Sequence, residues 1–183
     1  MRKTVVAIAL SALVTLGLSG CVSGISSNPS AEQSTEFSMN DIMFAQMMIP
    51  HHEQAVELAA IAETNTSNPE ILDLASRIKN AQQPEIDQMK AWLDASGSGM
   101  DMGHNMNMPG IVSDEDMTVI RAARDTEFDV LFLTHMIAHH EGAIDMVNDL
   151  LSDTTNAEAK ALGAAIITAQ TTEIAEMIAL LAE

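Results

Sequence analysis

The sequence predicts an all-α protein, a four-helix bundle built from two tandem helical hairpins with one short extra helix. Hydrophobic residues make up 47% of the chain but aromatic residues only 3%. Ala, Leu, Ile and Met therefore supply most of the apolar surface, and these residues favour helices over sheets. Apolar residues also recur at spacings of three and four over long segments, which is the helical period.

An internal repeat determines the architecture. Residues 41–94 align with residues 129–182 without a gap, and 20 of the 54 aligned pairs are identical. Two copies of one hairpin, related by a pseudo-twofold axis, make a four-helix bundle. The identical pairs include Asp41/Asp129, Phe44/Phe132, Met48/Met136, His51/His139, His52/His140, Ala55/Ala143, Gln82/Gln170, Glu85/Glu173 and Met89/Met177.

Residues 1–20 have the pattern of an export signal. A positive start precedes an uncharged, mostly apolar run from Thr4 to Leu18, which is too short for a comfortable membrane span. The run leads into Leu-Ser-Gly-Cys, which resembles the bacterial lipobox, a signal whose cysteine is lipidated. Cys21 is the only cysteine, and without lipidation it would be an odd free thiol in an oxidising compartment. An ordinary cleaved signal is the alternative.

This signal predicts where the protein resides. We expect export followed by lipid anchoring through Cys21. The predicted location is the outer face of the bacterial cytoplasmic membrane or the periplasm. Residues 21–37 are Ser-rich and lack periodicity, so they are expected to form a flexible tether. Residues 38–183 would form the bundle domain. The formal net charge of −18 disfavours nucleic acid and anionic lipid faces as partners.

The first helix of each repeat is expected from about Asn40 to Ala62 and from about Glu127 to Leu151. Both segments show helical periodicity with little Gly-Pro punctuation. Pro50 could kink the first of them, because proline cannot donate to the preceding turn.

The second helix of the first repeat is expected to start at Asn68-Pro69-Glu70, and its copy near Asn156. Asn suits the N-cap, Pro suits the first turn, and Glu interacts favourably with the positive end of the helix. Pro84 is a second possible kink.

Two further segments join the repeats. Residues 96–110 are expected to be a loop because of their Gly content. Residues 114–124 are expected to form the short extra helix, with Ser113 as its cap.

Two histidines of each repeat lie on or beside the apolar stripe of the first helix. At about 100° per residue, His51 falls in the middle of the stripe and His52 at its edge, and His139 and His140 behave alike. The pseudo-twofold axis would let His51 and His139 meet inside the bundle.

Each of these four histidines has a Met or another His one turn before it. Residues four apart share a helix face and can bind one ion together. A buried imidazole needs partners for both nitrogens, and around His51 the sequence offers mainly thioethers, methyl groups and another imidazole. The alternative is a hydrogen-bonded structural cluster in which Met provides packing. The candidate metal ligands in the helices are His51, His52, His135, His139, His140, Met47, Met48 and Met136.

The ligand types indicate the metal. Imidazole with thioether favours a soft ion, above all Cu(I), whereas zinc would gain little from Met. The ferritin-type di-iron motif places Glu three residues before His, but those positions hold Ile49 and Ile137. Asp41 and Asp129 could reach the edge of the stripe, yet a carboxylate-bridged iron pair would lack ligands. Copper, as Cu(I), is the predicted ion, with another transition metal as the alternative.

The loop between the repeats carries a second set of soft ligands. Its Met residues stand in a polar, Gly-rich context, so burial does not account for them. Thioethers remain suitable ligands where thiols would oxidise. The alternative is a Met-rich low-complexity linker. The candidates for a weaker copper or silver site are Met100, Met102, His104, Met106 and Met108.

The paired motifs resemble a bacterial family, the domain of unknown function 305. Its members are similar in two helical halves, each with a Phe, a Met-Ile-x-His-His and a following Ala, and the match covers about residues 40–183. The resemblance implies a ferritin-like helical bundle, often exported, with copper binding in some members. The matching residues here are Phe44, Met48, Ile49, His51, His52 and Ala55, then Phe132, Met136, Ile137, His139, His140 and Ala143.

The two halves differ at positions near the histidines. Met47 stands where the second half has His135, and Gln54 stands where it has Gly142. The halves are therefore expected to contribute unequally to a site.

Together these features predict an extracytoplasmic lipoprotein that binds copper, most favourably Cu(I), for sequestration, tolerance or delivery. A ferritin-like di-metal oxidase is one alternative, and it predicts oxygen consumption and inward carboxylates near the histidines. A structural or interaction bundle on the cell surface is the other, and it predicts that changing His51 and His139 alters stability but no ligand binding. The sequence has no recognisable nucleophile–base set or phosphate loop.

Overall fold

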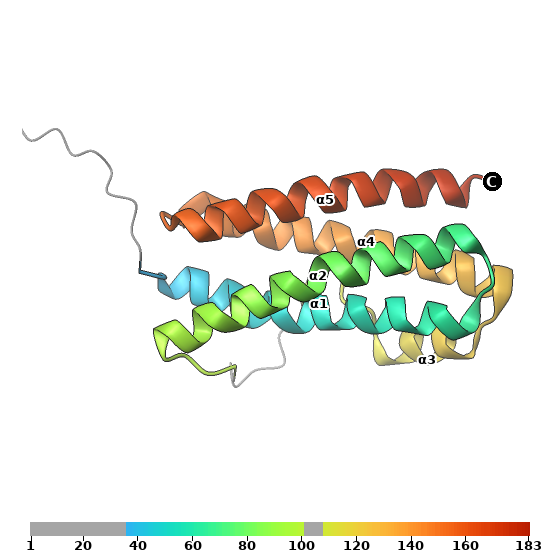
Figure 1. Ribbon diagram of the computed structural model, residues 1–183, viewed down its shortest axis with the longest axis horizontal. Coiled ribbons are helices and arrows are strands. Elements are labelled where there is room, and N and C mark those ends of the chain that lie inside the picture. The colour runs from blue at the N-terminus through green and yellow to red at the C-terminus, as the bar shows by residue number, and fades with distance from the viewer. Residues whose placement is uncertain (1–35, 101–107) are drawn as a thin grey trace, which may run out of the picture. The chain divides into compact units, whose positions relative to one another are not determined.

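The computed structural model describes residues 36–100 and 108–183, within a compact unit of residues 33–183. The predicted signal, Cys21 and residues 22–35 of the predicted tether lie outside the described residues, whereas Phe37 at the end of the predicted tether stacks on Trp92. The described part contains helices and no strands, which confirms the predicted all-α class (Figure 1). The helices are α1 (Met39–Asn65), α2 (Pro69–Ser96), α3 (Asp114–Ala122), α4 (Asp125–Asp153) and α5 (Ala157–Leu181).

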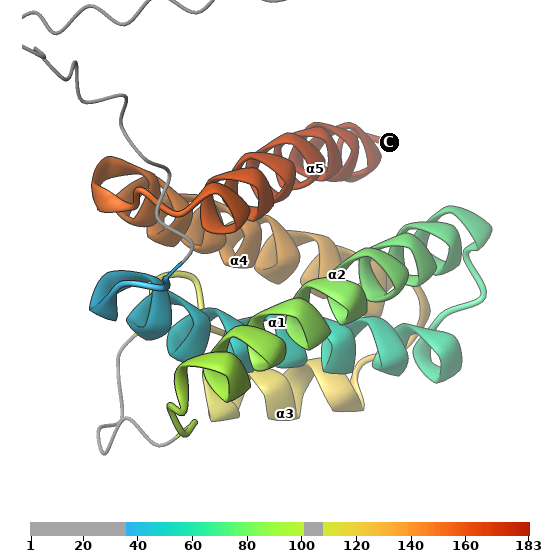
Figure 2. The same cartoon turned by 60° about the vertical axis from the view of Figure 1, so that its left-hand side comes forward.

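Each repeat folds into a helical hairpin, α1 with α2 and α4 with α5. The two hairpins pack on each other through α1 and α4, which run in opposite directions (Figures 1 and 2). The short helix α3 packs on α4 and places Met117 and Ile120 in the core. The duplicated sequence thus produces a duplicated structure whose halves meet at the two histidine-bearing helices.

The predicted capping residues start three helices. Asn68 accepts from the backbone of α2, Ser113 from that of α3 and Asn156 from that of α5. A capping box of Ser38 and Asp41, which was not predicted, precedes α1. Helix α1 begins one residue before and ends three residues after its predicted bounds, and α4 exceeds its predicted bounds by two residues at each end. Pro50 lies inside α1 and Pro84 inside α2, and each helix continues past its proline.

The apolar core is divided into two clusters. Phe128 and Phe132 belong to one, and Phe44 and Trp92 belong to the other. Both repeats contribute to each cluster. Seven buried polar residues lie near mid-length on the long helices and belong to neither cluster. We call them the polar layer: His51, His52, Gln82, His139, His140, Gln170 and Glu173.

Helix α5 meets two criteria for a membrane-crossing segment. Among the described residues it is the one helix with suitable length and mean hydropathy, 1.3 over its most apolar window. Core helices of soluble proteins meet the same criteria. Here α5 packs on α4 as part of the bundle.

Asn65, buried at the end of α1, connects that helix to the end of α3. Its Nδ2 donates toward the carbonyl oxygens of Ile120, Arg121 and Ala123 at 3.3, 3.1 and 2.9 Å. Asn65→Asp would place a charged acceptor against these acceptors. We expect a loss of about 2–4 kcal/mol in the free energy of unfolding, measured by urea denaturation. Asn80→Asp, on the exposed side of α2, is the control, and an equal loss in both variants would contradict this account.

Candidate metal centre

His51 of α1 and His139 of α4 meet at the centre of the polar layer, as expected from the pseudo-twofold axis. Their ring centroids lie 3.8 Å apart with the planes tilted by 38°. Both side chains are fully buried. Two imidazoles from the two repeats therefore lie in contact where α1 crosses α4.

Most ring nitrogens of this pair have no partner. His51 Nε2 lies 2.9 Å from the carbonyl oxygen of Pro109, so it donates its proton there. Among the described residues, His51 Nδ1 and both nitrogens of His139 have no partner with hydrogen-bond geometry. Unpaired buried polar atoms are costly and uncommon in native interiors. The pair therefore offers free ring nitrogens to a ligand.

Both rings are held neutral. Burial lowers the pKa of His51 from 6.5 to about 4. Burial, followed by the neighbouring His51, lowers the pKa of His139 well below its ordinary value. A neutral imidazole keeps a lone pair on one nitrogen, and that is the form that binds metal ions.

His52 and His140 each pair with a carboxylate from the second helix of the same repeat. His52 Nε2 lies 2.8 Å from Glu85 Oε2, and His140 Nε2 lies 2.7 Å from Glu173 Oε2. The Nδ1 atoms of both histidines have no partner among the described residues. Inward carboxylates near the histidines therefore come from α2 and α5 and not from the histidine-bearing helices themselves.

Two buried glutamines complete the polar layer. Gln82 and Gln170 each have 2% of their surface exposed. Neither the amide nitrogen nor the amide oxygen of either side chain has a hydrogen-bond partner among the described residues. Each glutamine lies one turn before the glutamate of its helix, so the two side chains share a helix face.

The other candidate ligands of α1 and α4, three methionines and His135, are either fully or partly buried. Met48 and Met136 are fully buried, one in each apolar cluster. Met47 is partly buried and packs on the cluster of Met48, and His135 is also partly buried. Because α1 and α4 are antiparallel, Met47 and His135 lie on opposite sides of the central pair.

A segment of the connection, residues 108–112, crosses this pair and is called the strap. Gly110 has φ +73°, and a Cβ there would lie 2.3 Å from the carbonyl oxygen of Ala138. A Cβ on Gly142 would lie 2.1 Å from the carbonyl oxygen of Pro109. Only glycines allow the strap and α4 to approach this closely.

Gln54 fixes the other side of the strap. Its Nε2 donates to the carbonyl of Val112 at 2.9 Å, and its Oε1 accepts from the amide of Val112 at 2.8 Å. Gln54 and Gly142 occupy the same position in the two repeats. The expected inequality between the halves thus has a structural cause, because one residue binds the strap and the other leaves room for it.

The predicted loop site is only partly covered by the described residues. Met102, His104 and Met106 lie outside the described residues. Met100 is 45% exposed, whereas Met108 is partly buried against the apolar cluster of Met48. The capture of copper or silver by this loop stays a prediction.

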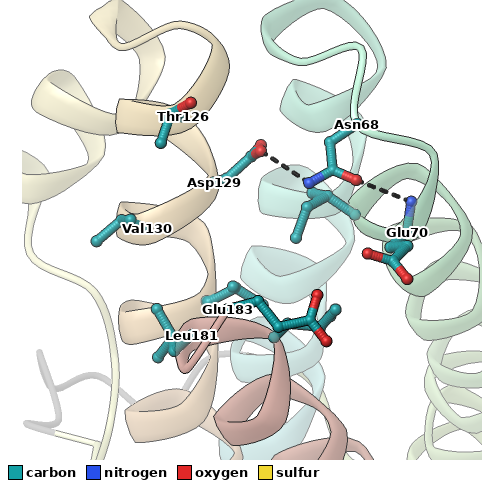
Figure 3. A pocket seen from close by; sticks show the side chains of 10 residues that line it. Asn68, Glu70, Thr126, Asp129, Val130, Leu181 and Glu183 are labelled. Atoms are coloured by element: carbon teal, nitrogen blue, oxygen red, sulfur yellow. Dashed lines mark hydrogen bonds between the residues drawn. The ribbon is translucent and has the colours of Figure 1, made fainter.

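Asp41 and Asp129 make contacts at helix ends. Asp41 accepts from the amide and hydroxyl of Ser38, and Asp129 accepts from Asn68 Nδ2 at 3.1 Å. Figure 3 shows Asp129 beside Asn68 in a pocket that contains no histidine. The structure therefore assigns both aspartates to helix-end contacts.

Within residues 36–100 and 108–183, no three His, Cys, Asp or Glu side chains form a ready-made metal cluster. The polar layer instead presents pairs of such residues, with thioether and amide groups nearby. A metal bound here would take ligands of several chemical types.

Comparison with known proteins identifies the family. The DUF305 profile, described as a domain of unknown function, matches residues 41–181. The chain belongs to the DUF305 family. No functionally curated protein was found to match it.

Solved structures share this fold. A DUF305 protein from Streptomyces coelicolor, described as a putative secreted protein, is 30% identical with a TM-score of 0.74, over 78% of this chain and 92% of that one. A DUF305 fragment from Deinococcus radiodurans is 26% identical, also with a TM-score of 0.74, over 80% and 98%. CopM in its Cu(I)-bound form is 30% identical with a TM-score of 0.65, over 79% and 96%. CopM was also solved in Cu(II)-bound, silver-bound and apo forms.

Proposed function

We propose that this protein is an extracytoplasmic, lipid-anchored metal-binding protein that binds copper, with Cu(I) preferred, for sequestration or delivery. The observation that carries the proposal is the contact between His51 and His139. Three of their four ring nitrogens are buried without a partner among the described residues. Export and anchoring through Cys21 are the part of the proposal that rests on the signal sequence.

The donor set fits a soft cation. Neutral imidazole nitrogens and thioethers suit Cu(I) and Ag(I) better than magnesium or calcium. His51 and His139 would supply nitrogens, with Met48 and Met136 as buried thioethers on either side. The likeness to CopM, solved with Cu(I), Cu(II) and silver, supports this choice. His135 and Met47 are the remaining proposed copper ligands, and His52 and His140 are proposed metal ligands together with the carboxylates that they contact.

An anaerobic Cu(I) titration against a competing chelator tests the proposal. The protein would be a chain from residue 22 onward, which keeps the whole compact unit. Tight binding is expected in this chain, and it should be lost in the His51→Ala/His139→Ala variant. A variant lacking the Met residues at 100–108 should lose only weaker sites. Loss of tight binding in the loop variant alone would contradict the bundle site.

One observation favours a second function, a ferritin-like di-metal oxidase. That alternative requires inward carboxylates near the histidines, and Glu85 and Glu173 contact His52 and His140. It predicts oxygen consumption when the protein is supplied with Fe(II) or Cu(I) in air. An oxygen electrode distinguishes the two functions, because a sequestering protein consumes no more oxygen than the free ion does.

A further inference from the structure

The polar layer contains two donor groups that the central copper pair does not use. The sequence repeats Gln-x-x-Glu in α2 and α5. In each copy the glutamate contacts a histidine of its own hairpin, and the glutamine lies one turn before that glutamate on the same helix face. In both hairpins the group consists of an imidazole, a carboxylate and a primary amide. The two triplets are His52, Glu85 and Gln82, and His140, Glu173 and Gln170.

In each hairpin an imidazole nitrogen and a carboxylate oxygen face each other at hydrogen-bond distance. The imidazole nitrogen and the carboxylate oxygen lie 2.8 Å apart around His52 and 2.7 Å apart around His140. Zn²⁺ binds such atoms at about 2.0–2.2 Å in tetrahedral geometry, which places two ligands roughly 3.4 Å apart. A cation that replaces the proton between these two atoms therefore requires them to separate by roughly 0.6 Å.

The glutamines give independent evidence for a ligand. Gln82 lies between Ile78 and Ile86, which belong to different apolar clusters, so a leucine there would continue the core. Instead a primary amide is 98% buried, with no partner for either polar atom among the described residues. Gln170 repeats this in the second hairpin. The amide oxygen is an acceptor able to ligate a cation.

We propose that each triplet is a binding site for a divalent first-row transition cation, which gives the protein two equivalent nitrogen–oxygen sites. Imidazole with oxygen ligands suits Cu(II), Zn(II) or Co(II), whereas the central pair with its thioethers suits Cu(I). The proposal extends the metal-binding function to a harder ion and does not depend on copper at the central pair. A neutral imidazole and a carboxylate carry one negative charge, which a divalent cation more than neutralises.

Solvent reaches these triplets from the outer helices. The side chains of Glu85 and Glu173 are 17% and 11% exposed, while His52 and His140 are 0% exposed. Glu173 also lines a shallow groove between α2 and α5, together with Arg77 and Thr172. A cation from solvent would therefore meet the carboxylate first and the imidazole second.

Titration with Co(II), followed by calorimetry and by its visible absorption, tests the proposal. We expect two equivalents per chain. Glu85→Gln and Glu173→Gln should each remove one equivalent, and the double variant both. Each lost site should weaken more than about 100-fold, because loss of an outer-sphere partner alone costs roughly 10–100-fold. Gln can still accept a hydrogen bond from His, so folding should be kept.

Glu53→Gln and Glu141→Gln are the matched controls. These exposed residues directly follow His52 and His140 and change the net charge equally. Three results would each overturn the proposal. The controls could weaken Co(II) binding as much as Glu85→Gln does, the double variant could keep both equivalents, or the wild-type protein could bind no Co(II).

A second variant separates ligation from packing. Gln82→Leu/Gln170→Leu should keep or raise the free energy of unfolding of the metal-free protein, because it removes unpaired buried amides, while it lowers Co(II) affinity. Unchanged Co(II) affinity would overturn the role of the glutamines. Cu(I) titration of the Glu85→Gln/Glu173→Gln variant should match wild type, so failure at the triplets is distinguishable from failure of the central copper site.

Discussion

Replacing Gly142 by Ala is expected to lower the free energy of unfolding by roughly 2–4 kcal/mol. The added Cβ would lie 2.1 Å from the carbonyl oxygen and 2.3 Å from the carbonyl carbon of Pro109. Both are backbone atoms, so the strap as a whole must move. This movement takes the Pro109 carbonyl from His51 Nε2 and leaves a buried donor unpaired, at a cost of about 1–3 kcal/mol. It also strains the two hydrogen bonds between Gln54 and Val112.

Gly163→Ala is the matched control for this prediction. Gly163 also lies inside a helix, but its Cβ would first meet the side chains of Val147 at 3.0 Å and Leu151 at 3.2 Å. Side-chain ends can adjust, and Ala gains up to about 1 kcal/mol in helix propensity. Urea denaturation should place Gly163→Ala close to wild type and Gly142→Ala well below it. Hydrogen exchange of the Val112 amide should accelerate in Gly142→Ala alone. Equal stability of the two variants would contradict the close approach of the strap.

The internal repeat explains why much of the fold was predictable. A helical period combined with an ungapped duplication leaves few arrangements other than two equivalent hairpins. A pseudo-twofold axis through such hairpins also brings corresponding residues together, so the meeting of His51 and His139 followed from their matched positions. The capping residues were local signals and could be recognised in the sequence without knowledge of the packing.

The contacts between helices were not predictable in the same way. The ferritin motif places carboxylate and histidine on one helix, whereas Glu85 and Glu173 reach their histidines from the neighbouring helix, 33 residues away in the chain. The sequence did contain a signal for these carboxylates, because Glu85 and Glu173 occupy the same position in the two repeats. The strap depends on the path of an unrepeated segment, and neither period nor duplication constrains that path. Gln54 and Gly142 indicated only that the halves differ.

The metal-free protein is expected to lose stability steeply as the pH falls from 7 to 5. In the unfolded chain His51 and His139 take up protons near pH 6.5, but in the folded chain burial holds the pKa of His51 at about 4 and that of His139 well below 6.5. Between these limits the unfolded state binds more protons than the folded state, so acid favours unfolding. Each histidine contributes about 1.4 kcal/mol per pH unit in that window, and the two together remove roughly 3–4 kcal/mol by pH 5.

Urea denaturation at pH 7 and pH 5, with a chelator present, measures this loss. The control is the His51→Leu/His139→Leu variant, which removes the two titrating rings and keeps His52, His140 and their glutamates. Contributions from those groups and from the acidic surface cancel in the difference between the two proteins. The variant should have the flatter pH dependence, by roughly two protons in slope. Equal slopes would mean that the two central imidazoles take up protons in the folded protein. Such a site would bind a soft cation poorly, because protons compete for the same ring nitrogens. The pH dependence of the metal-free protein therefore tests the chemical premise of the copper proposal before any metal is added.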